Sequence, residues 1–230
     1  MSAAKNPWRT DKVYRTRAQV EPFVRTLEDA LSTFGEVKVC GSWRRGAELI
    51  GDLDVVIVND ECAITQQMID AIAEVLPEFV YERGGENGPM ANAHLTLEDG
   101  ELHLDLYAAV EGQRGAMLWF LTGPKNLNIQ MRAEAGRKGW MLNQYGLWGG
   151  PDHDQQVDDG SEADIGRKLG FCLQPRDRQQ FAEPVNRSRT KTVLSSDGVT
   201  TYTVTFDGAS ASCTCPGYKY RRRCRHIQVR

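Results

Sequence analysis

The sequence lacks the features that mark a membrane or secreted protein. No apolar run approaches the ~18 residues that a membrane-spanning helix needs, and the N-terminus, Met1 to Asn6, has no apolar signal core. We therefore expect a cytoplasmic protein, or a nuclear one in a eukaryotic cell, without membrane contact. The chain also lacks the overall positive charge of a uniformly basic nucleic-acid binder, since its net charge is −3.

Cysteine and charge are both distributed unevenly along the chain. Three of the six cysteines lie close together near the C-terminus beside a histidine, which in a reducing compartment favours metal binding over disulfide bonds. Residues 185–230 carry nine Lys/Arg and two Asp, a balance of +7, which leaves −10 for the first 184 residues. The C-terminal segment is therefore the candidate for contact with phosphates.

The apolar pattern predicts an α+β fold. Two segments have apolar residues at helical spacing, and Gly35 and Pro77 end them. Farther along, two alternating segments flank Asp99-Gly100, a dipeptide typical of a tight β-hairpin turn. The predicted elements are helices over 18–34 and 64–76, a strand over 37–40, a loop over 84–92 and a hairpin over 94–107.

Two aspartates open a buried strand just after a glycine-rich turn. Asp52 and Asp54 precede the apolar run Val55 to Val58, and residues two apart in a strand project to the same face. Paired carboxylates favour a cation between them, and hard oxygen ligands suit Mg²⁺. In Gly41-Ser42-Trp43-Arg44-Arg45-Gly46, backbone N–H groups, a hydroxyl and the Arg45 guanidinium can hold an anion. A lone Asp-x-Asp is more often a solvated strand end, but this combination indicates phosphoryl transfer on a nucleoside triphosphate.

A third aspartate lies in the second strand of the hairpin. Asp105 shares one face of this strand with His103 and Tyr107, while three leucines share the other face. Aspartate is unfavourable within a strand, so its presence needs a reason. A third carboxylate beside Asp52 and Asp54 supplies one.

The whole combination resembles the nucleotidyltransferase superfamily that includes DNA polymerase beta, and within it the family X DNA polymerases. The resemblance implies two Mg²⁺ ions, with Mn²⁺ as an alternative, about 4 Å apart. One ion would be held by Asp52, Asp54 and Asp105 at a primer 3′-hydroxyl, and the other by Asp52 and Asp54 at the β,γ-phosphates. Asp105 is then also a candidate base. The family usually carries an arginine where this chain has His103.

Residues 113–147 carry a second resemblance to family X, through an aromatic residue before Thr-Gly, an Asn, an Arg and Gly-x-x-Leu-Asn-x-Tyr-Gly-Leu. Phe120-Leu121 stands where the family usually has Tyr-Phe. The resemblance implies that Asn128 reaches the minor-groove edge of the incoming base and that Arg132 contacts the template strand. The implied nucleotide-binding residues are Gly41, Ser42, Arg45, Gly51, Phe120, Thr122, Gly123 and Asn128, and Lys125 adds positive charge near the triphosphate or template.

Residues 162–178 resemble the end of the polymerase thumb, so the resemblance covers about residues 10–181. The implied domains are a palm over 1–110, built on a mixed sheet with flanking helices, a thumb over 111–181, a linker over 182–190 and a small β-hairpin zinc-binding module over 191–230. The family's N-terminal lyase domain has no counterpart, and we expect no 5′-deoxyribose phosphate lyase activity.

The last segment predicts a two- or three-stranded meander followed by a metal site. Cys213, Cys215, Cys224 and His226 suit a closed tetrahedral zinc site, with a redox pair or free thiols as the alternatives. The Cys-x-Cys…Cys-x-His pattern resembles the SWIM zinc finger, a family that binds nucleic acids or proteins. Basic and aromatic residues inside the motif favour contact with DNA over a merely solubilising role: Lys219, Tyr220, Arg221, Arg222 and Arg223.

The leading hypothesis is a template-directed DNA polymerase that fills short gaps in DNA repair. It would act as a monomer on primer-template or gapped DNA with dNTPs, and the zinc finger would anchor DNA. One alternative is a template-independent nucleotidyltransferase that acts on a primer end or a protein hydroxyl. A second is a nucleic-acid or protein adaptor with a vestigial palm, in which the finger binds a protein partner.

Overall fold

The computed structural model describes residues 12–182, 188–195, 200–207, 210–221 and 223–227. The chain divides into two compact units, Met1–Ala182 and Glu183–Arg230, and each is described by itself. Residues 183–187, which make up most of the predicted linker, lie outside the described part of the chain.

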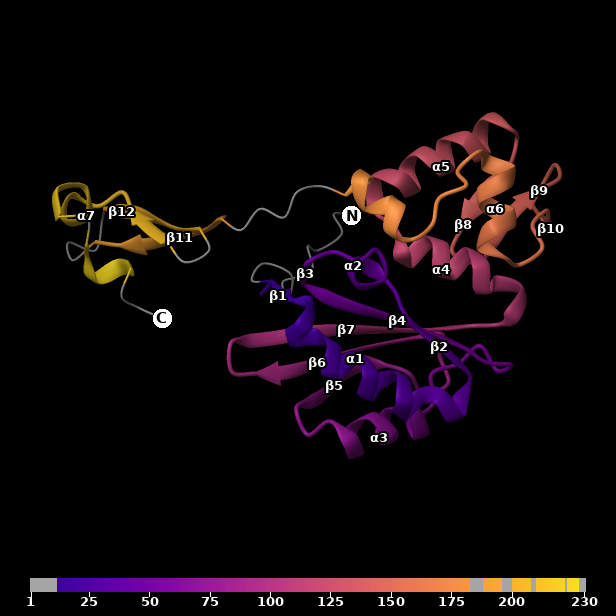
Figure 1. The fold of residues 1–230 in the computed structure, drawn as a ribbon, viewed down its shortest axis with the longest axis horizontal. Helices are drawn as coiled ribbons and strands as arrows, with labels where there is room; N and C mark the ends of the chain where they lie inside the picture. Colours follow the sequence, from indigo (N-terminus) through magenta and orange to yellow (C-terminus); the bar gives the residue numbers. More distant parts are fainter. Residues whose placement is uncertain (1–11, 183–187, 196–199, 208–209, 222, 228–230) are drawn as a thin grey trace. The chain divides into compact units, whose positions relative to one another are not determined.

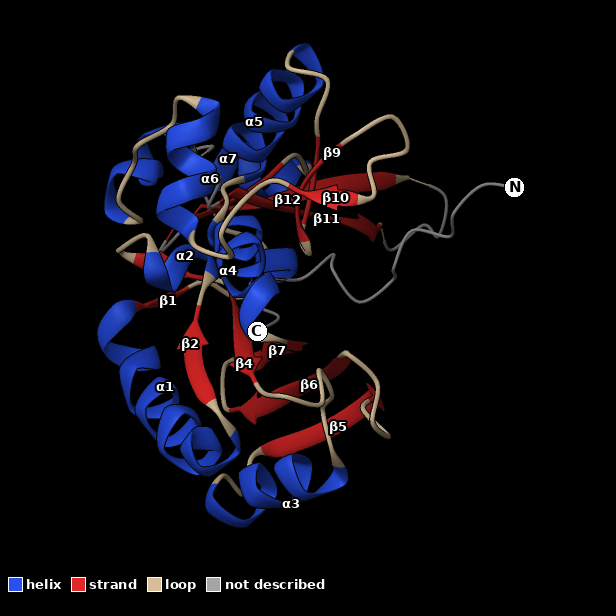
Figure 2. Ribbon diagram, turned by 90° about the vertical axis from the view of Figure 1, so that its right-hand side faces the viewer, coloured by secondary structure: helices blue, strands red, loops and turns tan. Residues whose placement is uncertain are grey.

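A five-stranded mixed sheet organises the first half of unit 1 (Figure 1). Only β4 and β7, at its centre, run parallel, and the other neighbours are antiparallel. Two helices cover one face of this sheet (Figure 2). The strands, in spatial order, are β2 (Glu36–Val39), β4 (Asp52–Val58), β7 (Gly100–Ala109), β6 (Met90–Leu97) and β5 (Phe79–Gly84), and the covering helices are α1 (Arg17–Leu31) and α3 (Gln66–Val75). We call this part, with β1 (Arg15–Thr16), η2 (Ser32–Phe34), α2 (Gly41–Arg44) and β3 (Leu49–Ile50), the sheet subdomain.

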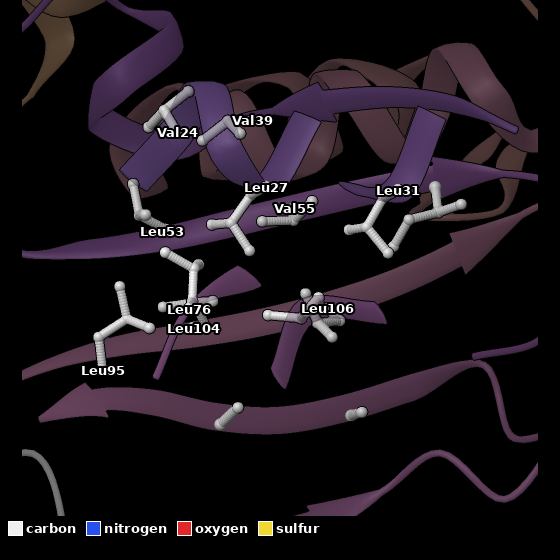
Figure 3. Packing of buried hydrophobic residues seen from close by; sticks show 14 of the residues in the cluster. Val24, Leu27, Leu31, Val39, Leu53, Val55, Leu76, Leu95, Leu104 and Leu106 are labelled. Atoms are coloured by element: carbon white, nitrogen blue, oxygen red, sulfur yellow. The ribbon is translucent and has the colours of Figure 1, made fainter. Parts of the chain in front are cut away.

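The core of the sheet subdomain explains which face of the sheet stays open. Leu53 and Val55 of β4 and Leu104 and Leu106 of β7 are fully buried, and they pack with Leu27 of α1 in one cluster (Figure 3). Burying each of these side chains stabilises the fold by about 1.5–3 kcal/mol. Because side chains alternate along a strand, the residues between them project from the opposite face. Met117 and Leu118 cover this face at Val56 and Val58, and we call the uncovered part beside Asp52 and Asp54 the open face.

The second half of unit 1 is built around its own core and is called the helical subdomain. Its buried residues include Trp119, Leu127 and Ile165, one from each of three helices. No helix among the described residues is long and apolar enough to cross a membrane. The elements are η3 (Glu111–Gln113), α4 (Arg114–Thr122), α5 (Lys125–Arg137), β8 (Met141–Asn143), β9 (Gly146–Gly149), β10 (Gln155–Gln156), α6 (Glu162–Leu169) and η4 (Arg176–Phe181).

Unit 2 contains a three-stranded antiparallel sheet in the order of the chain. Its elements are β11 (Ser188–Leu194), β12 (Thr201–Asp207), β13 (Ser210–Cys213), α7 (Pro216–Arg221) and η5 (Arg225–Ile227). The buried residues Val204, Cys213 and Cys215 form a small cluster. Since this core is too small to stabilise a unit of this size, another source of stability is required.

Three predicted elements in this part of the chain differ from the structure. The loop expected over 84–92 is strand from Met90 onward, because residues 90–92 pair with β7, and this long-range pairing was not visible in the local pattern. The turn expected at Gly41 is the short helix α2. The second predicted helix begins at Gln66, after Thr65 accepts a hydrogen bond from the backbone N–H of Met68 at 3.4 Å.

A largely buried ion-pair network joins the two subdomains. Arg44 of α2 donates both Nη atoms to the Glu162 carboxylate, at 2.8 and 2.5 Å, and Nη1 also donates to Thr122 Oγ1 at 2.8 Å. The same carboxylate accepts from Arg178 Nη2 at 3.1 Å. Arg178 is 1% exposed and stacks on the Trp119 ring, with Cζ 3.7 Å from the ring centroid. One carboxylate therefore neutralises two guanidinium groups.

We expect Glu162→Ala to lower the free energy of unfolding by about 3 kcal/mol, because the buried Arg178 and the partly buried Arg44 would both lose their counter-charge. Chemical denaturation followed by tryptophan fluorescence measures this. The matched control is Glu134→Ala on α5, where the ion pair with the exposed Arg137 contributes about 0.5 kcal/mol or less. Equal effects of the two substitutions would show that the network does not stabilise the chain.

Candidate active site and zinc site

The three aspartates lie together on the open face of the sheet. Asp54 of β4 and Asp105 of β7 are direct partners in the parallel register, and Asp52 is paired with His103. All three aspartates are half-buried. Leu53, which lies between Asp52 and Asp54 in β4, is fully buried on the other face. The two central strands thus bring together carboxylates that are far apart in the sequence.

Two further residues contact these carboxylates. Asn92 of β6 donates from Nδ2 to Asp105 Oδ1 at 2.6 Å, and Lys12 forms an ion pair with Asp52. Asn92 therefore supports Asp105. His103, two residues before Asp105 on the same face of β7, has its Nε2 3.8 Å from Glu101 Oε2. Sequence reasoning missed the contacts of Asn92 with Asp105 and of Lys12 with Asp52. The predicted Asp99-Gly100 turn would have placed Asn92 opposite Tyr107. The turn lies instead at Glu98-Asp99, with Gly100 already in β7, and this register pairs Asn92 with Asp105. No sequence signal indicated Lys12.

The turn before β4 closely approaches the aspartates. Gly41 has φ +59°, and a Cβ atom built there would lie 2.6 Å from Asp54 Oδ2. The Ser42 hydroxyl next to it is buried and has no hydrogen-bond partner among the described residues. A buried hydroxyl without a partner is costly unless a ligand satisfies it. Backbone and hydroxyl donors at this turn therefore fit an anion.

We expect Gly41→Ala to weaken the binding of Mn²⁺ to the three aspartates about tenfold, because the new Cβ would displace the Asp54 carboxylate and the positive φ would be strained. Titration of Mn²⁺ into the chain, followed by electron paramagnetic resonance, measures this affinity. Gly136→Ala on α5 is the control, since a Cβ there meets nothing within 4 Å. An unchanged affinity in Gly41→Ala would contradict the role of this close approach.

The structure places the remaining predicted residues of the turn at other contacts. Arg45 donates from Nε to Gln179 at 3.0 Å and from Nη1 to the Thr122 carbonyl, which ties it to the helical subdomain. Burial lowers the pKa of Arg45, while Asp54 and Asp52 act to raise it. Gly51 is packed against the N-terminal segment, where a Cβ would meet Tyr14 at 2.9 Å.

The other predicted nucleotide-side residues lie around the end of α4. Asn128 Nδ2 donates to the Phe120 carbonyl at 2.7 Å, and the Arg132 guanidinium lies over the Phe120 ring at 5.1 Å. A Cβ at Gly123 would lie 3.7 Å from Arg45 Nη1 and 3.9 Å from Asn128 Nδ2. The structure thus brings Arg45, Gly123 and Asn128 close to one another. The buried Thr122 hydroxyl accepts from Arg44, and Lys125 is exposed at the start of α5.

Four metal-ligating side chains meet in unit 2. One ligand atom from each of Cys213, Cys215, Cys224 and His226 lies within 4.8 Å of the others, and Cys213 Sγ is 3.6 Å from His226 Nδ1. Burial raises the pKa of Cys213 to about 11. Burial acts in the same direction on Cys215, but hydrogen bonds from the Tyr218 N–H, His226 and the other two thiols outweigh it and lower the pKa to about 7. The donor set fits zinc, whose charge would let all three thiols ionise.

Basic and aromatic residues surround this cluster. Lys219, Tyr220 and Arg221 lie on α7 and are exposed, Tyr220 by 83%. Arg223 is also exposed, whereas Arg222 lies outside the described residues. An exposed aromatic ring among cations is the combination that binds a nucleic-acid backbone and stacks on a base.

Three family models match the chain. They are DNA polymerase beta palm over residues 13–84, DNA polymerase beta thumb over residues 117–179, and SWIM zinc finger over residues 202–227. The palm match includes Asp52 and Asp54, and the thumb match includes Phe120, Asn128 and Arg132. The two polymerase models together match more than half of the chain.

Named relatives agree with these matches. The chain is 27% identical over 112 residues to the repair DNA polymerase X of an African swine fever virus isolate. The aligned region covers 49% of this chain and 63% of that protein. It is 26% identical over 140 residues to DNA polymerase lambda of Rattus norvegicus, which covers 56% of this chain and 24% of that protein. The chain therefore spans less than two thirds of the length of these relatives.

The fold is shared with a solved polymerase. The structure of Leishmania infantum polymerase beta in a ternary P/T complex matches with a TM-score of 0.59 at 20% identity, over 72% of this chain and 77% of that chain. This likeness shows the fold alone. The three family models and the named relatives identify the chain as a member of the polymerase beta-like family X, with a palm and a thumb followed by a SWIM zinc finger.

Proposed function

We propose that this chain is a template-directed DNA polymerase that adds a dNTP to a primer 3′-hydroxyl and fills short gaps during DNA repair. The observation that carries the proposal is the pairing of Asp54 with Asp105 on the open face of the sheet, with Asp54 close to Gly41. The next residue, Ser42, has a buried hydroxyl that meets no partner in the described part of the chain. The family membership supports the same reaction class. The relatives' names, repair DNA polymerase X and DNA polymerase lambda, support DNA as the substrate.

The residues on the open face fit divalent metal ions. Three carboxylates from neighbouring strands offer hard oxygen donors, and Lys12 already places a positive charge against one of them. Asp52, Asp54 and Asp105 would hold Mg²⁺, or Mn²⁺ in its place. When bound, these ions would lower the pKa of the primer hydroxyl and neutralise charge on the departing pyrophosphate.

The chain's own residues would orient the reactants. Asn92 holds one Asp105 oxygen at 2.6 Å and would keep that carboxylate near the attacking hydroxyl, whose proton Asp105 would accept. The Gly41 and Ser42 donors would bind phosphate oxygens of the incoming nucleotide. Phe120, Thr122 and Gly123 would pack against its sugar. This arrangement requires that the Asn128 bond to the Phe120 carbonyl and the position of Arg132 over the Phe120 ring change when base and template bind.

We further propose that the zinc finger anchors DNA. Its sulfur and imidazole donors fit one structural zinc ion, and Lys219, Arg221 and Arg223 are exposed close to them. The rest of the chain has a net charge of −10 over the first 184 residues, so it would attract DNA only weakly without a separate basic contact.

Primer extension on a one-nucleotide-gapped duplex with Mg²⁺, offering each dNTP singly, tests the function. Insertion of only the complementary nucleotide would support the proposal. Equal addition of every dNTP to a bare single-stranded primer would favour a template-independent transferase instead. No incorporation on either substrate, with the finger still binding DNA or protein, would favour an adaptor.

A further inference from the structure

A lateral row of paired residues crosses the sheet on the same face as the aspartates. Asp54 of β4 pairs with Asp105 of β7, and Asp105 pairs with Asn92 of β6. Asn92 in turn pairs with Arg83 of β5, the strand at the edge of the sheet (Figure 2). Directly paired residues share one face of a sheet, and neighbouring strands lie about 4.8 Å apart. The row therefore leads from the two central carboxylates through an amide to a guanidinium.

A bulge in β5 brings Arg83 into this row. The register shifts after Tyr81, where regular pairing would place Glu82 opposite Asn92, and Arg83 takes that position instead. Bulges of this kind redirect side chains and are frequent next to active sites. With Glu82 in the row, the Asn92 amide would face a carboxylate on each side, and neither could donate to its oxygen. The bulge thus exchanges an acceptor for a cationic donor.

Two hydrogen bonds fix the orientation of the Asn92 amide. Arg83 Nε donates to Asn92 Oδ1 at 3.0 Å, and Asn92 Nδ2 donates to Asp105 Oδ1 at 2.6 Å. A guanidinium can only donate, and an ionised carboxylate can only accept. The amide therefore satisfies both neighbours in one orientation, with its oxygen toward Arg83 and its nitrogen toward Asp105. The positive charge on Arg83 also polarises the amide, which strengthens its bond to the carboxylate.

We propose that Arg83 is a positioning residue for the metal ions at the aspartates and that it acts on Asp105 through Asn92. The guanidinium is exposed and separated from Asp105 by the Asn92 strand, so it would hold this carboxylate in place without binding the metal itself. The inference rests on the proposed function, because it takes Asp105 as a metal ligand. It adds a residue of the edge strand to the support of that ligand.

The direction of the change in metal affinity distinguishes positioning from a simple effect of charge. Removing a positive charge near bound cations would strengthen their binding, because a repulsion is lost. Loss of positioning would weaken it. We expect Arg83→Gln to weaken the binding of Mn²⁺ about three- to tenfold, and Asn92→Ala about tenfold. Titration of Mn²⁺ into the full chain, with Zn²⁺ already in the finger and without DNA or nucleotide, measures the affinity by electron paramagnetic resonance.

A double-mutant cycle tests whether Arg83 acts through Asn92. In the Asn92→Ala background, Arg83→Gln should weaken Mn²⁺ binding no further, because the connecting amide is gone. Arg83→Lys retains the charge and a donor, and its affinity should stay within about threefold of the unaltered chain. Arg25→Gln is the control, since it removes an exposed arginine from an ion pair on α1 and should change nothing. Circular dichroism confirms that each variant is folded.

The outcomes separate this inference from the proposed function. An unchanged or raised Mn²⁺ affinity in Arg83→Gln would overturn the positioning role, and so would equal losses with and without Asn92. Asp105→Asn shows whether the carboxylate itself binds metal. If Asp105→Asn weakens Mn²⁺ binding and Arg83→Gln does not, only the positioning role fails. If Asp105→Asn binds Mn²⁺ as tightly as the unaltered chain, the metal role of Asp105 is wrong and the inference fails with it.

Discussion

Asp54→Asn is expected to lower the rate of nucleotide insertion into a gapped duplex by roughly a thousandfold, which corresponds to about 4 kcal/mol of transition-state stabilisation. Asp54 is the central carboxylate of the three, since it faces Asp105 in the register and lies against Gly41. An amide in its place is a weak and uncharged ligand for Mg²⁺. Single-turnover kinetics at saturating DNA and dNTP measures the effect.

Stability separates a functional from a structural role of Asp54. Three carboxylates held close together repel one another, so Asn at this position should leave the melting temperature unchanged or raise it. The matched control is Asp70→Asn on the exposed side of α3, which should alter neither the rate nor the stability. A melting temperature that falls in Asp54→Asn in proportion to the lost activity would assign Asp54 to the fold instead.

Cys224→Ala is expected to unfold unit 2 and to weaken DNA binding about tenfold or more at low salt. The finger's core is small, and the free energy of zinc binding is the principal source of order in such a domain. Each phosphate contact contributes about 0.9 to the dependence of log K on log salt concentration. If Lys219, Arg221 and Arg223 make such contacts, the slope should become shallower by about 1–3 in the variant.

The insertion rate at saturating DNA should change by less than about twofold in Cys224→Ala, because the finger would contribute to binding and not to the transition state. Cys172→Ala provides the control, since Cys172 is an exposed free cysteine of the helical subdomain outside the zinc-binding motif. Fluorescence anisotropy of labelled gapped DNA over a series of salt concentrations measures affinity and slope together. An unchanged slope would show that the finger does not contact DNA, which would leave a protein partner as the alternative.

The local pattern of the sequence predicted those parts of the fold that depend on local periodicity. The alternation of Leu102, Leu104 and Leu106 with His103, Asp105 and Tyr107 was sufficient to assign Asp105 to the open face. The 3.6-residue period was sufficient for α1 and α3. The three thiols and the imidazole of the finger could also be grouped from residue type and spacing, because their ligand atoms come from a short segment.

The contacts that could not be predicted join residues distant in the sequence. Arg44 and Arg45 are adjacent, yet Arg44 binds Glu162 and Arg45 binds the Thr122 carbonyl and Gln179. Neither spacing nor residue type distinguishes a guanidinium that binds a ligand from one that joins two subdomains. Asn92 was missed for a related reason, since its strand is defined only by pairing with β7.

Asn92 and Asp54 both lie beside Asp105, but they are separated from it by very different lengths of chain. This difference bears on the order of folding. Asn92 is 13 residues from Asp105 within one hairpin, so their strands can pair early through a tight turn. Asp54 reaches Asp105 only through the parallel β4–β7 pairing, which must wait until the intervening α3, β5 and β6 are arranged. We therefore expect that a chain emerging from the ribosome positions Asp105 against its supporting amide before the carboxylates of β4 and β7 meet. The three aspartates would then come together only after all five strands of the sheet have paired.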